Sequence, residues 1–256
     1  MESSNKGKGN KKIPEVKIFP VAFALGEIKE NITINTNTPS NPSKEQIINQ
    51  AFKFHSEGNI PAAEKHYQFF INQGFRDHRV YSNYGIILNN LGKLKEAEIL
   101  YRKAIEIKPD YAIAHSNRGN VLKGLGKLKE AELSCRKAIE VNPKLAEAYA
   151  NLGGILKDLG KPQEAEISYR KAIKLNPKLA EVHSSLGTLL LELGNLKESI
   201  ICYEKAIDLD QNFDEAKAGM GRIFLMTGQL KEGVVKMREA YGSINFNYKN
   251  SNIIIN

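Results

Sequence analysis

A sequence pattern that returns every 34 residues constrains the fold of this chain more than any other feature. The stretch from Ala146 to Leu179 contains two helical patterns joined by a short turn, and the same pattern recurs 34 residues before it and after it. Units of this length cannot bury their apolar faces alone, so they stack on their neighbours into an array. The 256-residue chain is therefore expected to form an elongated all-α array rather than two compact domains.

The first half of this unit has the pattern of a helix with one apolar face. Tyr149, Leu152, Gly153 and Leu156 stand at i, i+3, i+4 and i+7, which places them on one side of a helix. Gly160 follows, and glycine is favoured there because it adopts the left-handed conformation that ends many helices. The sequence thus predicts one short helix that ends at this glycine.

The second half predicts another helix that packs on the first. It begins near Pro162, because proline suits the first turn of a helix, where its missing N–H costs nothing. Ala165, Tyr169 and Ala172 form its apolar stripe, and Pro177 follows its end. Because the glycine and alanines at the contact carry almost no side chain, we expect the two backbones to approach closely, with tyrosine or leucine in the gaps.

These residues stand at the spacings of the tetratricopeptide repeat (TPR), which the unit resembles. The resemblance covers most of the chain and implies a right-handed superhelical α-solenoid of about six helix pairs. The units that it defines are residues 44–77, 78–111, 112–145, 146–179, 180–213 and 214–247. The first unit lacks the closing proline, as terminal repeats often depart from the pattern.

The two ends of the chain lie outside this pattern. Residues 1–43 are predicted to be an irregular or disordered segment and linker, and residues 248–256 a C-terminal tail. Near the N-terminus only residues 21–25 are continuously apolar, which is too short for a signal peptide or a membrane span. Ser43 and Gln46 match a capping box, so the first helix should start directly after Ser43.

The last unit is the least regular one. Lys217 and Gly233 occupy places that hold larger residues or better helix formers elsewhere, so this helix pair should fray first. The apolar run from Ile253 to Ile255 either packs back on the last helix or leaves that end as a surface for self-association. The sequence does not decide between the two.

The net charge of +8 raises the question of a nucleic-acid partner. Opposite charges alternate along the predicted second helices, however, and form i,i+4 pairs in the favoured order: Glu98/Arg102, Glu132/Arg136 and Glu166/Arg170. Such a pattern is typical of a solvated outer face. The sequence thus predicts no nucleic-acid partner and no membrane partner.

The two cysteines, Cys135 and Cys202, lie on the second helices of non-adjacent units, at places that should face other helices. A disulfide between them is geometrically disfavoured, and buried thiols are predicted instead. Free thiols fit a reducing compartment, so a cytoplasmic location is expected.

The sequence contains no catalytic or metal-binding signature that we recognise. His115 and His183 take a packing place that Tyr81 and Tyr149 hold in other units, and the five histidines show no metal-ligand spacing. Glycine–lysine pairs such as the one at Gly126 lie in turns that lack the other residues of a phosphate-binding loop. We therefore expect no enzyme activity, no cofactor and no metal.

The part of each first helix that is not used for packing is the candidate binding surface. Counted from the start of each unit, it comprises the second, fifth, sixth, ninth, twelfth and thirteenth places. The resemblance implies that this stripe lines a concave groove that holds an extended peptide or a partner helix. At the sixth place, four successive units carry an asparagine: Asn49, Asn83, Asn117 and Asn151.

This row of asparagines, called the asparagine ladder below, is similar to that in the repeats of O-linked N-acetylglucosamine transferases. An asparagine amide both donates and accepts hydrogen bonds, which suits the backbone of an extended chain of any sequence. The alternative is structural, with the amides satisfying backbone groups between helices. Ser185 and Gly219 take the sixth place in the last two units, so the ladder ends at the fourth.

A polar to basic wall is predicted around the ladder. Its members are Arg79, Ser82, Asn89, Ser116, Asn120, Lys123 and Lys157. Farther along, the groove becomes apolar at Leu191, Leu225 and Met226, with Glu147, Glu181 and Glu215 on its rim. Family members that clamp a terminal carboxylate use lysine or arginine at several groove sites together, and the fifth places here hold none, so that mode is not expected.

The leading hypothesis is a non-enzymatic protein-interaction scaffold that binds an extended peptide or partner segment in the groove. The alternative is the substrate-recruiting arm of a glycosyltransferase or sulfotransferase system, whose activity lies in trans or in a missing part of the chain. Self-association through the C-terminal repeat is a third prediction. The sequence does not identify the partner.

Overall fold

The computed structural model describes residues 42–242, 244–247 and 252–255. The predictions made for residues 1–41 fall outside this part of the chain. Within it the fold is an all-α helical repeat of about six helix pairs, followed by a short β-hairpin. The chain divides into two compact units, one that ends at Arg76 and one that begins at Asp77.

The first unit contains one helix pair, α1 (Lys44–Ser56) and α2 (Ile60–Asn72). The capping box that the sequence predicts is confirmed, since the Gln46 N–H donates to Ser43 Oγ at 3.3 Å and the Ser43 N–H to Gln46 Oε1 at 2.7 Å. Tyr67 and Phe70 of α2 are fully buried in this unit. Its two helices therefore share a small core of their own.

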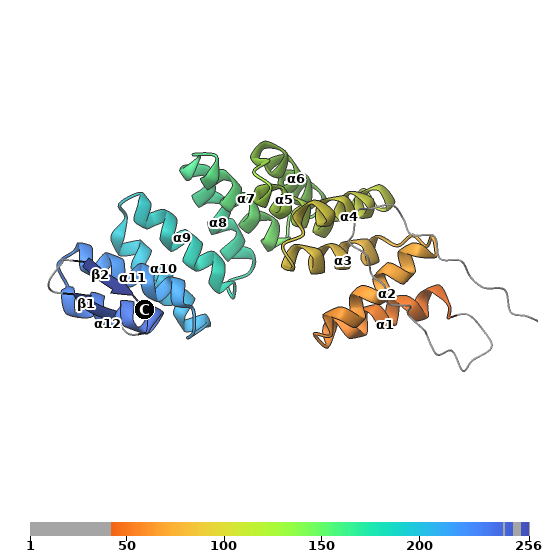
Figure 1. The fold of residues 1–256 in the computed structure, drawn as a ribbon. Coiled ribbons are helices and arrows are strands. Elements are labelled where there is room, and N and C mark those ends of the chain that lie inside the picture. The colour runs from red at the N-terminus through yellow and green to blue at the C-terminus, as the bar shows by residue number, and fades with distance from the viewer. Residues whose placement is uncertain (1–41, 243, 248–251, 256) are drawn as a thin grey trace, which may run out of the picture. The chain divides into compact units, whose positions relative to one another are not determined.

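The second unit begins at α3 and contains the remaining helix pairs, which Figure 1 shows in order from yellow to blue. Its helices are α3 (His78–Asn90), α4 (Leu94–Ile107), α5 (Ala112–Gly124), α6 (Leu128–Val141), α7 (Ala146–Asp158), α8 (Pro162–Leu175), α9 (Ala180–Glu192), α10 (Leu196–Leu209), α11 (Asp214–Met226) and α12 (Leu230–Tyr241). Each first helix packs on the second helix of its pair, and from α5 onward it also packs on the helix before it. The even-numbered helices are the second helices.

The turns between paired helices explain why the elements recur at a fixed interval. After α7, Gly160 adopts a φ of 73°, and its N–H donates to the Lys157 carbonyl at 2.9 Å. The N–H of Lys161 then donates to the Leu156 carbonyl at 2.9 Å. These bonds satisfy carbonyls that the end of a helix leaves unpaired, which is the role that glycine has after a helix.

The small residue at the eighth place makes room for an aromatic ring. A Cβ added to Gly153 would lie 2.7 Å from ring carbons of Tyr169, and one added to Gly85 would lie 2.8 Å from the ring of Tyr101. The sequence predicted that two backbones approach each other here. It also predicted that tyrosine or leucine fills the remaining gaps, and in both pairs a tyrosine ring occupies the space that a Cβ on the glycine would need.

The second helices are joined by ion pairs along their outer side. The three i,i+4 pairs predicted from the sequence are present, with N–O distances of 3.8 Å for Glu98–Arg102, 2.7 Å for Glu132–Arg136 and 2.8 Å for Glu166–Arg170. Two of these arginines also reach the next repeat. Arg136 lies 3.3 Å from Glu164, and Arg170 lies 2.6 Å from Glu198. The outer charges therefore link α6 to α8 and α8 to α10.

The buried polar residues have the packing roles that the sequence predicted. Cys135 and Cys202 are both buried free thiols. His115 and His183 are largely buried, and each places its Nε2 within hydrogen-bond distance of a proline carbonyl, at 2.8 Å from Pro109 and 3.0 Å from Pro177. Each histidine thus links the start of a first helix to the end of the preceding repeat.

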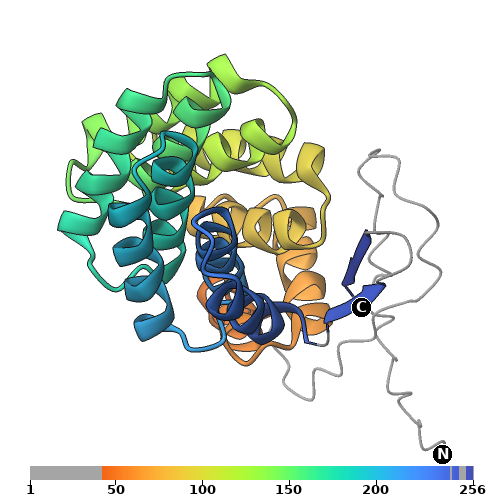
Figure 2. The same ribbon diagram turned by 90° about the vertical axis from the view of Figure 1, so that its left-hand side faces the viewer.

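The C-terminal end departs from the helical pattern. Residues 244–247, which the sequence placed in the last repeat, form β1 (Ile244–Asn247), and β2 (Asn252–Ile255) pairs with it antiparallel, so that Ile244 faces Ile255. Figure 2 shows this hairpin directly after α12. The Ile253–Ile255 run, for which the sequence left two arrangements open, is thus paired with the strand before it. Gly242, with a φ of 82°, ends the helix before the first strand.

Candidate peptide-binding face

The first helices of the second unit form a continuous row. Contacts join α3 to α5, α5 to α7, α7 to α9 and α9 to α11. We call the surface formed by the second, fifth, sixth, ninth, twelfth and thirteenth places of these helices the first-helix face. Because the helices are in contact, side chains at equal places of successive repeats become neighbours there.

The asparagine ladder has three members on this face. Asn83, Asn117 and Asn151 lie half-buried on α3, α5 and α7. Asn49 is exposed on α1, in the first unit, and is not part of the row that the second unit presents. The structure thus brings three of the four predicted asparagines onto one body.

The three amides do not have equal environments. Asn151 Nδ2 donates to the Ser116 carbonyl at 3.3 Å and to Ser116 Oγ at 3.0 Å, so it joins α7 to α5. Among the described residues, the amides of Asn83 and Asn117 make no hydrogen bond. Asn151 therefore has the structural role that the sequence left as an alternative, while the other two amides can bond to a guest.

Two of the predicted polar residues are inaccessible. Ser82 and Ser116 are each 1% exposed, so their hydroxyls cannot reach a guest on the surface. Asn89 is half-buried and Asn120 is exposed, both toward the C-terminal ends of their helices. The polar wall is therefore narrower than the sequence suggested.

The predicted basic residues are already paired with carboxylates. Arg79 Nη2 lies 2.8 Å from Asp77 Oδ2, and Arg79 Nε donates to Asp77 Oδ1 at 3.1 Å. Burial acts to raise the pKa of Asp77, but the hydrogen bonds and charge of Arg79 outweigh it and hold that pKa below its usual value. The two residues thus form an ion pair at the start of α3.

The two lysines of the wall are paired across repeats. Lys123 Nζ lies 3.4 Å from Asp158, and Lys157 Nζ lies 2.7 Å from Glu192. In both cases a twelfth place meets the thirteenth place of the next repeat. The polar to basic wall that the sequence predicts therefore has its two lysines paired with carboxylates of the next repeat.

The charges left unpaired on the first-helix face are mostly negative. Among the described residues, Glu147, Glu181 and Glu215 are exposed at the second place of α7, α9 and α11 and take part in no hydrogen bond or ion pair. Arg222, at the ninth place of α11, is also unpaired. The sequence analysis placed the three glutamates on the rim but missed Arg222, which the ninth place alone could have indicated.

A hollow of about 570 Å³ lies at the C-terminal end of this face. It is lined by Glu181, Ser184, Ser185, Thr188, Phe213, Glu215, Ala218, Arg222 and Tyr241. Thr188, which lines it, places its Oγ1 3.0 Å from the hydroxyl of the buried Tyr203 of α10. A Cβ added to Gly219 would lie 2.6 Å from Tyr203 Cε2, so the ring takes the space of a larger side chain at this sixth place.

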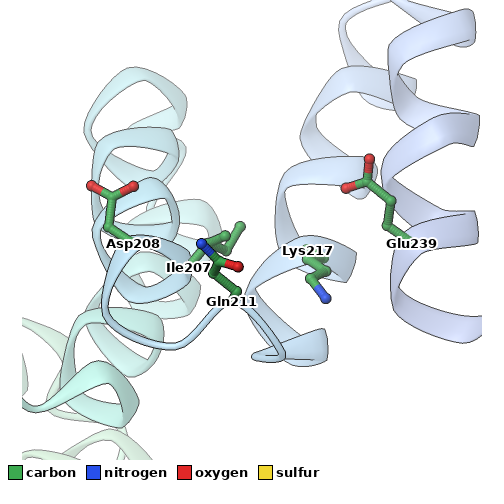
Figure 3. Close-up of a pocket in the computed structure, with 5 residues that line it drawn as sticks. All are labelled: Ile207, Asp208, Gln211, Lys217 and Glu239. Carbon is green, nitrogen blue, oxygen red and sulfur yellow. The ribbon is translucent and has the colours of Figure 1, made fainter.

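A second hollow lies where α10, α11 and α12 meet, as Figure 3 shows. Ile207 and Asp208 of α10, Gln211 of the following loop, Lys217 of α11 and Glu239 of α12 line it. The amine of Lys217 points away from Glu239 in this view and lies 3.1 Å from Asp214. Its charged groups do not converge on one point, so this hollow has no arrangement for a specific ligand.

Other classes of site are not found in the described ranges. These residues contain no group of three or more histidine, cysteine, aspartate or glutamate side chains that could hold a metal ion. Across the same stretches, every helix is either too short or too polar to cross a bilayer.

The fold and this face define a helical-repeat protein with a polar surface along its first helices. Two family models match the chain, one described as TPR repeat over residues 85–126 and one described as tetratricopeptide repeat over residues 112–145, 146–179 and 180–213. The chain belongs to the tetratricopeptide repeat family. Comparison with curated proteins gave no match.

Several solved structures share the fold. MamA is 25% identical, with a TM-score of 0.53 over 61% of this chain and 91% of that one. YrrB, described as a TPR protein with an unusual peptide-binding site, is 23% identical, with a TM-score of 0.51 over 68% of this chain and 90% of its own. PilF of Pseudomonas aeruginosa is 17% identical, with a TM-score of 0.67 over 78% and 93%.

Proposed function

We propose that this protein is a non-enzymatic scaffold that binds an extended polypeptide segment along its first-helix face. One observation carries the proposal: Asn83 and Asn117 present amides without hydrogen-bond partners at equal places of successive helices. Tetratricopeptide repeats generally mediate protein–protein interaction, and such arrays use the surface along their first helices.

The chemistry of the ladder favours a main-chain contact. An amide offers one acceptor and two donors, so it can pair with both the N–H and the C=O of a guest residue whatever its side chain. Since Asn83 and Asn117 are half-buried, a guest bond there would be partly shielded from water. A peptide site is part of the description of YrrB, although at 23% identity that likeness concerns the fold alone.

The proposal is tested with a random peptide library displayed on phage and selected on the full chain. Selected peptides are synthesised, and their affinities are measured for the wild type and for the Asn83→Ala/Asn117→Ala variant. We expect the double variant to bind about tenfold or more weakly, because each lost hydrogen bond contributes roughly 0.5–1.5 kcal/mol.

A matched control is available in Asn72→Ala/Asn212→Ala, which removes two exposed asparagines outside the first-helix face. This control should bind the selected peptides as the wild type does. Equal affinity of all three proteins would show that the ladder does not contact the guest. Asn151 is left unchanged because its amide already joins two helices.

The sequence also predicted a transferase-like mode of binding, a cytoplasmic location and self-association, and we keep these as parts of the proposal. The resemblance of the ladder to the repeats of O-linked N-acetylglucosamine transferases supports main-chain binding, and a recruiting arm acting in trans would hold the same guest. A cytoplasmic location agrees with the two buried thiols.

Self-association through the last repeat is supported by the exposed side chains of Leu230 and Tyr241 on α12. Light scattering that compares the full chain with its Leu230→Ser variant tests this prediction.

A further inference from the structure

We infer that the C-terminal half of the first-helix face selects a basic guest, with lysine or arginine at about every third residue. This inference rests on the proposed function and names the chemistry of the segment that would bind. It starts from the charges that the structure leaves unpaired. Glu147, Glu181 and Glu215 and one cation, Arg222, remain after the ion pairs of the face are formed.

The sign of the face is opposite to that of the whole chain. The chain carries a net charge of +8, yet the cations near the ladder are held by carboxylates, as in Lys123–Asp158 and Lys157–Glu192. A guest that approaches the first helices therefore meets three free carboxylates and one free guanidinium. Opposite charges on the guest favour both its encounter and its orientation.

The hollow at the C-terminal end gives a second, independent indication of a ligand. Ser184 lines it and is only 5% exposed, and its hydroxyl makes no hydrogen bond among the described residues. The hydroxyl oxygen is not sealed from solvent, so a guest in the hollow can replace water as its hydrogen-bond partner. Glu181 and Glu215 stand on the wall of the same hollow, where they can receive a cationic side chain.

Arg222 fixes how such a guest would lie. Its guanidinium donates hydrogen bonds and accepts none, so it suits carbonyl oxygens of the guest main chain. The guest side chains then point toward the glutamates at the second places, while its backbone lies nearer the ninth place. In this orientation the cationic side chains of the guest stay away from the guanidinium of Arg222.

The spacing of the glutamates selects a particular conformation. The helices α7, α9 and α11, which carry them, are in contact in succession, and packed helices lie about 8–10 Å apart. A polyproline II chain has three residues per turn and rises about 3.1 Å per residue, so every third side chain points the same way at intervals of about 9 Å. Lysines at i, i+3 and i+6 would therefore meet successive glutamates.

The test uses three synthetic peptides and the full chain. The first peptide is KPSKPSK, the second has the same composition with adjacent lysines, KKKPSPS, and the third is the acidic EPSEPSE. We expect KPSKPSK to bind at least several-fold more tightly than KKKPSPS, and EPSEPSE not to bind. Because the contacts involve exposed charges, the binding of KPSKPSK should weaken as salt is raised.

Two variants locate the binding. Glu147→Gln/Glu181→Gln/Glu215→Gln removes the three unpaired carboxylates of the face, and Glu96→Gln/Glu204→Gln/Glu232→Gln removes three exposed, unpaired carboxylates of the second helices. The first should lower the affinity for KPSKPSK roughly tenfold, in line with exposed ion pairs, and the second less than twofold. Circular dichroism confirms that both variants are folded.

Several results would overturn the inference. The two variants could lose the same amount of affinity for KPSKPSK, or the two basic peptides could bind equally well. The acidic peptide could bind more tightly than KPSKPSK, or KPSKPSK could fail to bind. If peptides selected from the random library still bind through Asn83 and Asn117, only the basic preference is wrong. If those also ignore the ladder, the proposed function fails with it.

Discussion

The central repeats and the last repeat follow the same sequence pattern, but their second helices differ in how many side chains they bury and in whether they form ion pairs with the next repeat. Helix α8 buries Ala165, Ser168, Tyr169 and Ala172, whereas α12 buries only Gly233. Arg170 of α8 reaches Glu198 of the next repeat. Among the described residues, the ion pair of α12 is internal, between Lys236 and Glu239.

This difference shows how much of a repeat's stability comes from its neighbours. In a linear array each repeat contributes its own stability and an interface with each adjacent repeat. Helix α8 is covered by repeats on both sides, but no helix pair follows α12 among the described residues. The prediction that the last pair frays first thus has a structural basis in its exposed side chains, such as Leu230 at 64% exposure.

The contrast with the largest expected effect lies at the eighth place. In Gly153→Val the new side chain would collide with the Tyr169 ring, and the cost should be about 3 kcal/mol. In Gly221→Val it meets Cγ of Met237 at 2.8 Å and the backbone nitrogen of Met237 at 3.1 Å; since methionine adapts more easily than a tyrosine ring, the cost should be smaller, about 2 kcal/mol. Urea unfolding followed by circular dichroism measures both, and equal losses would mean that the two helix pairs are packed equally tightly.

The second contrast concerns local opening. Burial raises the pKa of Cys135 to about 12 and that of Cys202 to about 11, the latter with a contribution from Glu198. At pH 8 both thiols are therefore protonated in the folded state, and alkylation by iodoacetamide should require opening. We expect Cys202, next to the last repeat, to react about tenfold faster than Cys135, which corresponds to about 1.4 kcal/mol.

Single-cysteine variants, Cys135→Ala and Cys202→Ala, assign the two rates, and mass spectrometry measures them. If Cys135 reacted as fast as Cys202, the central repeats would open as readily as the C-terminal ones. The stability gradient along the array would then be absent.

The third contrast separates the members of the ladder. Asn151→Ala removes hydrogen bonds to Ser116 and should destabilise the fold by about 1 kcal/mol. Asn117→Ala, which removes no such bond, should change stability by less than about 0.5 kcal/mol. Thermal unfolding of the two variants makes the comparison, and similar losses would indicate that both amides serve the fold.

The smallest contrast depends on pH. Hydrogen bonds from Arg136, and then from Lys161, hold the pKa of Glu132 below its usual value, although burial opposes them. Because the folded-state pKa is lowered, this carboxylate stabilises the fold above its unfolded-state pKa, and the contribution is lost as pH falls through the folded-state pKa. Glu132→Gln should therefore cost about 0.5–1 kcal/mol at pH 7, and the cost should shrink as the pH falls through the folded-state pKa.

The matched change on the last repeat is Glu232→Gln, since Glu232 of α12 is exposed and unpaired. Urea unfolding from pH 7 down into the acid range should show no effect of this change at any pH. A loss at pH 7 equal to that of Glu132→Gln would mean that the cross-repeat ion pairs add nothing to the central repeats.

The residues that make the fold could be recognised because their partners lie within one repeat. Gly153 and Tyr169, or Glu132 and Arg136, are separated by a fixed number of residues on a known helix geometry. The candidate site was harder to predict. The sequence placed Lys123 and Lys157 in a polar to basic wall but did not show their partners, because the carboxylates that pair with them stand one repeat further along.

The sequence by itself determined the helices, their turns and the buried small residues, since these follow from periodicity and from the conformations that glycine and proline allow. Only the tertiary structure decided which polar groups remain free. Whether a twelfth-place lysine meets a thirteenth-place carboxylate, or the amide of Asn151 meets Ser116, depends on the register between adjacent first helices. That register is set by packing across repeats, which no single repeat encodes.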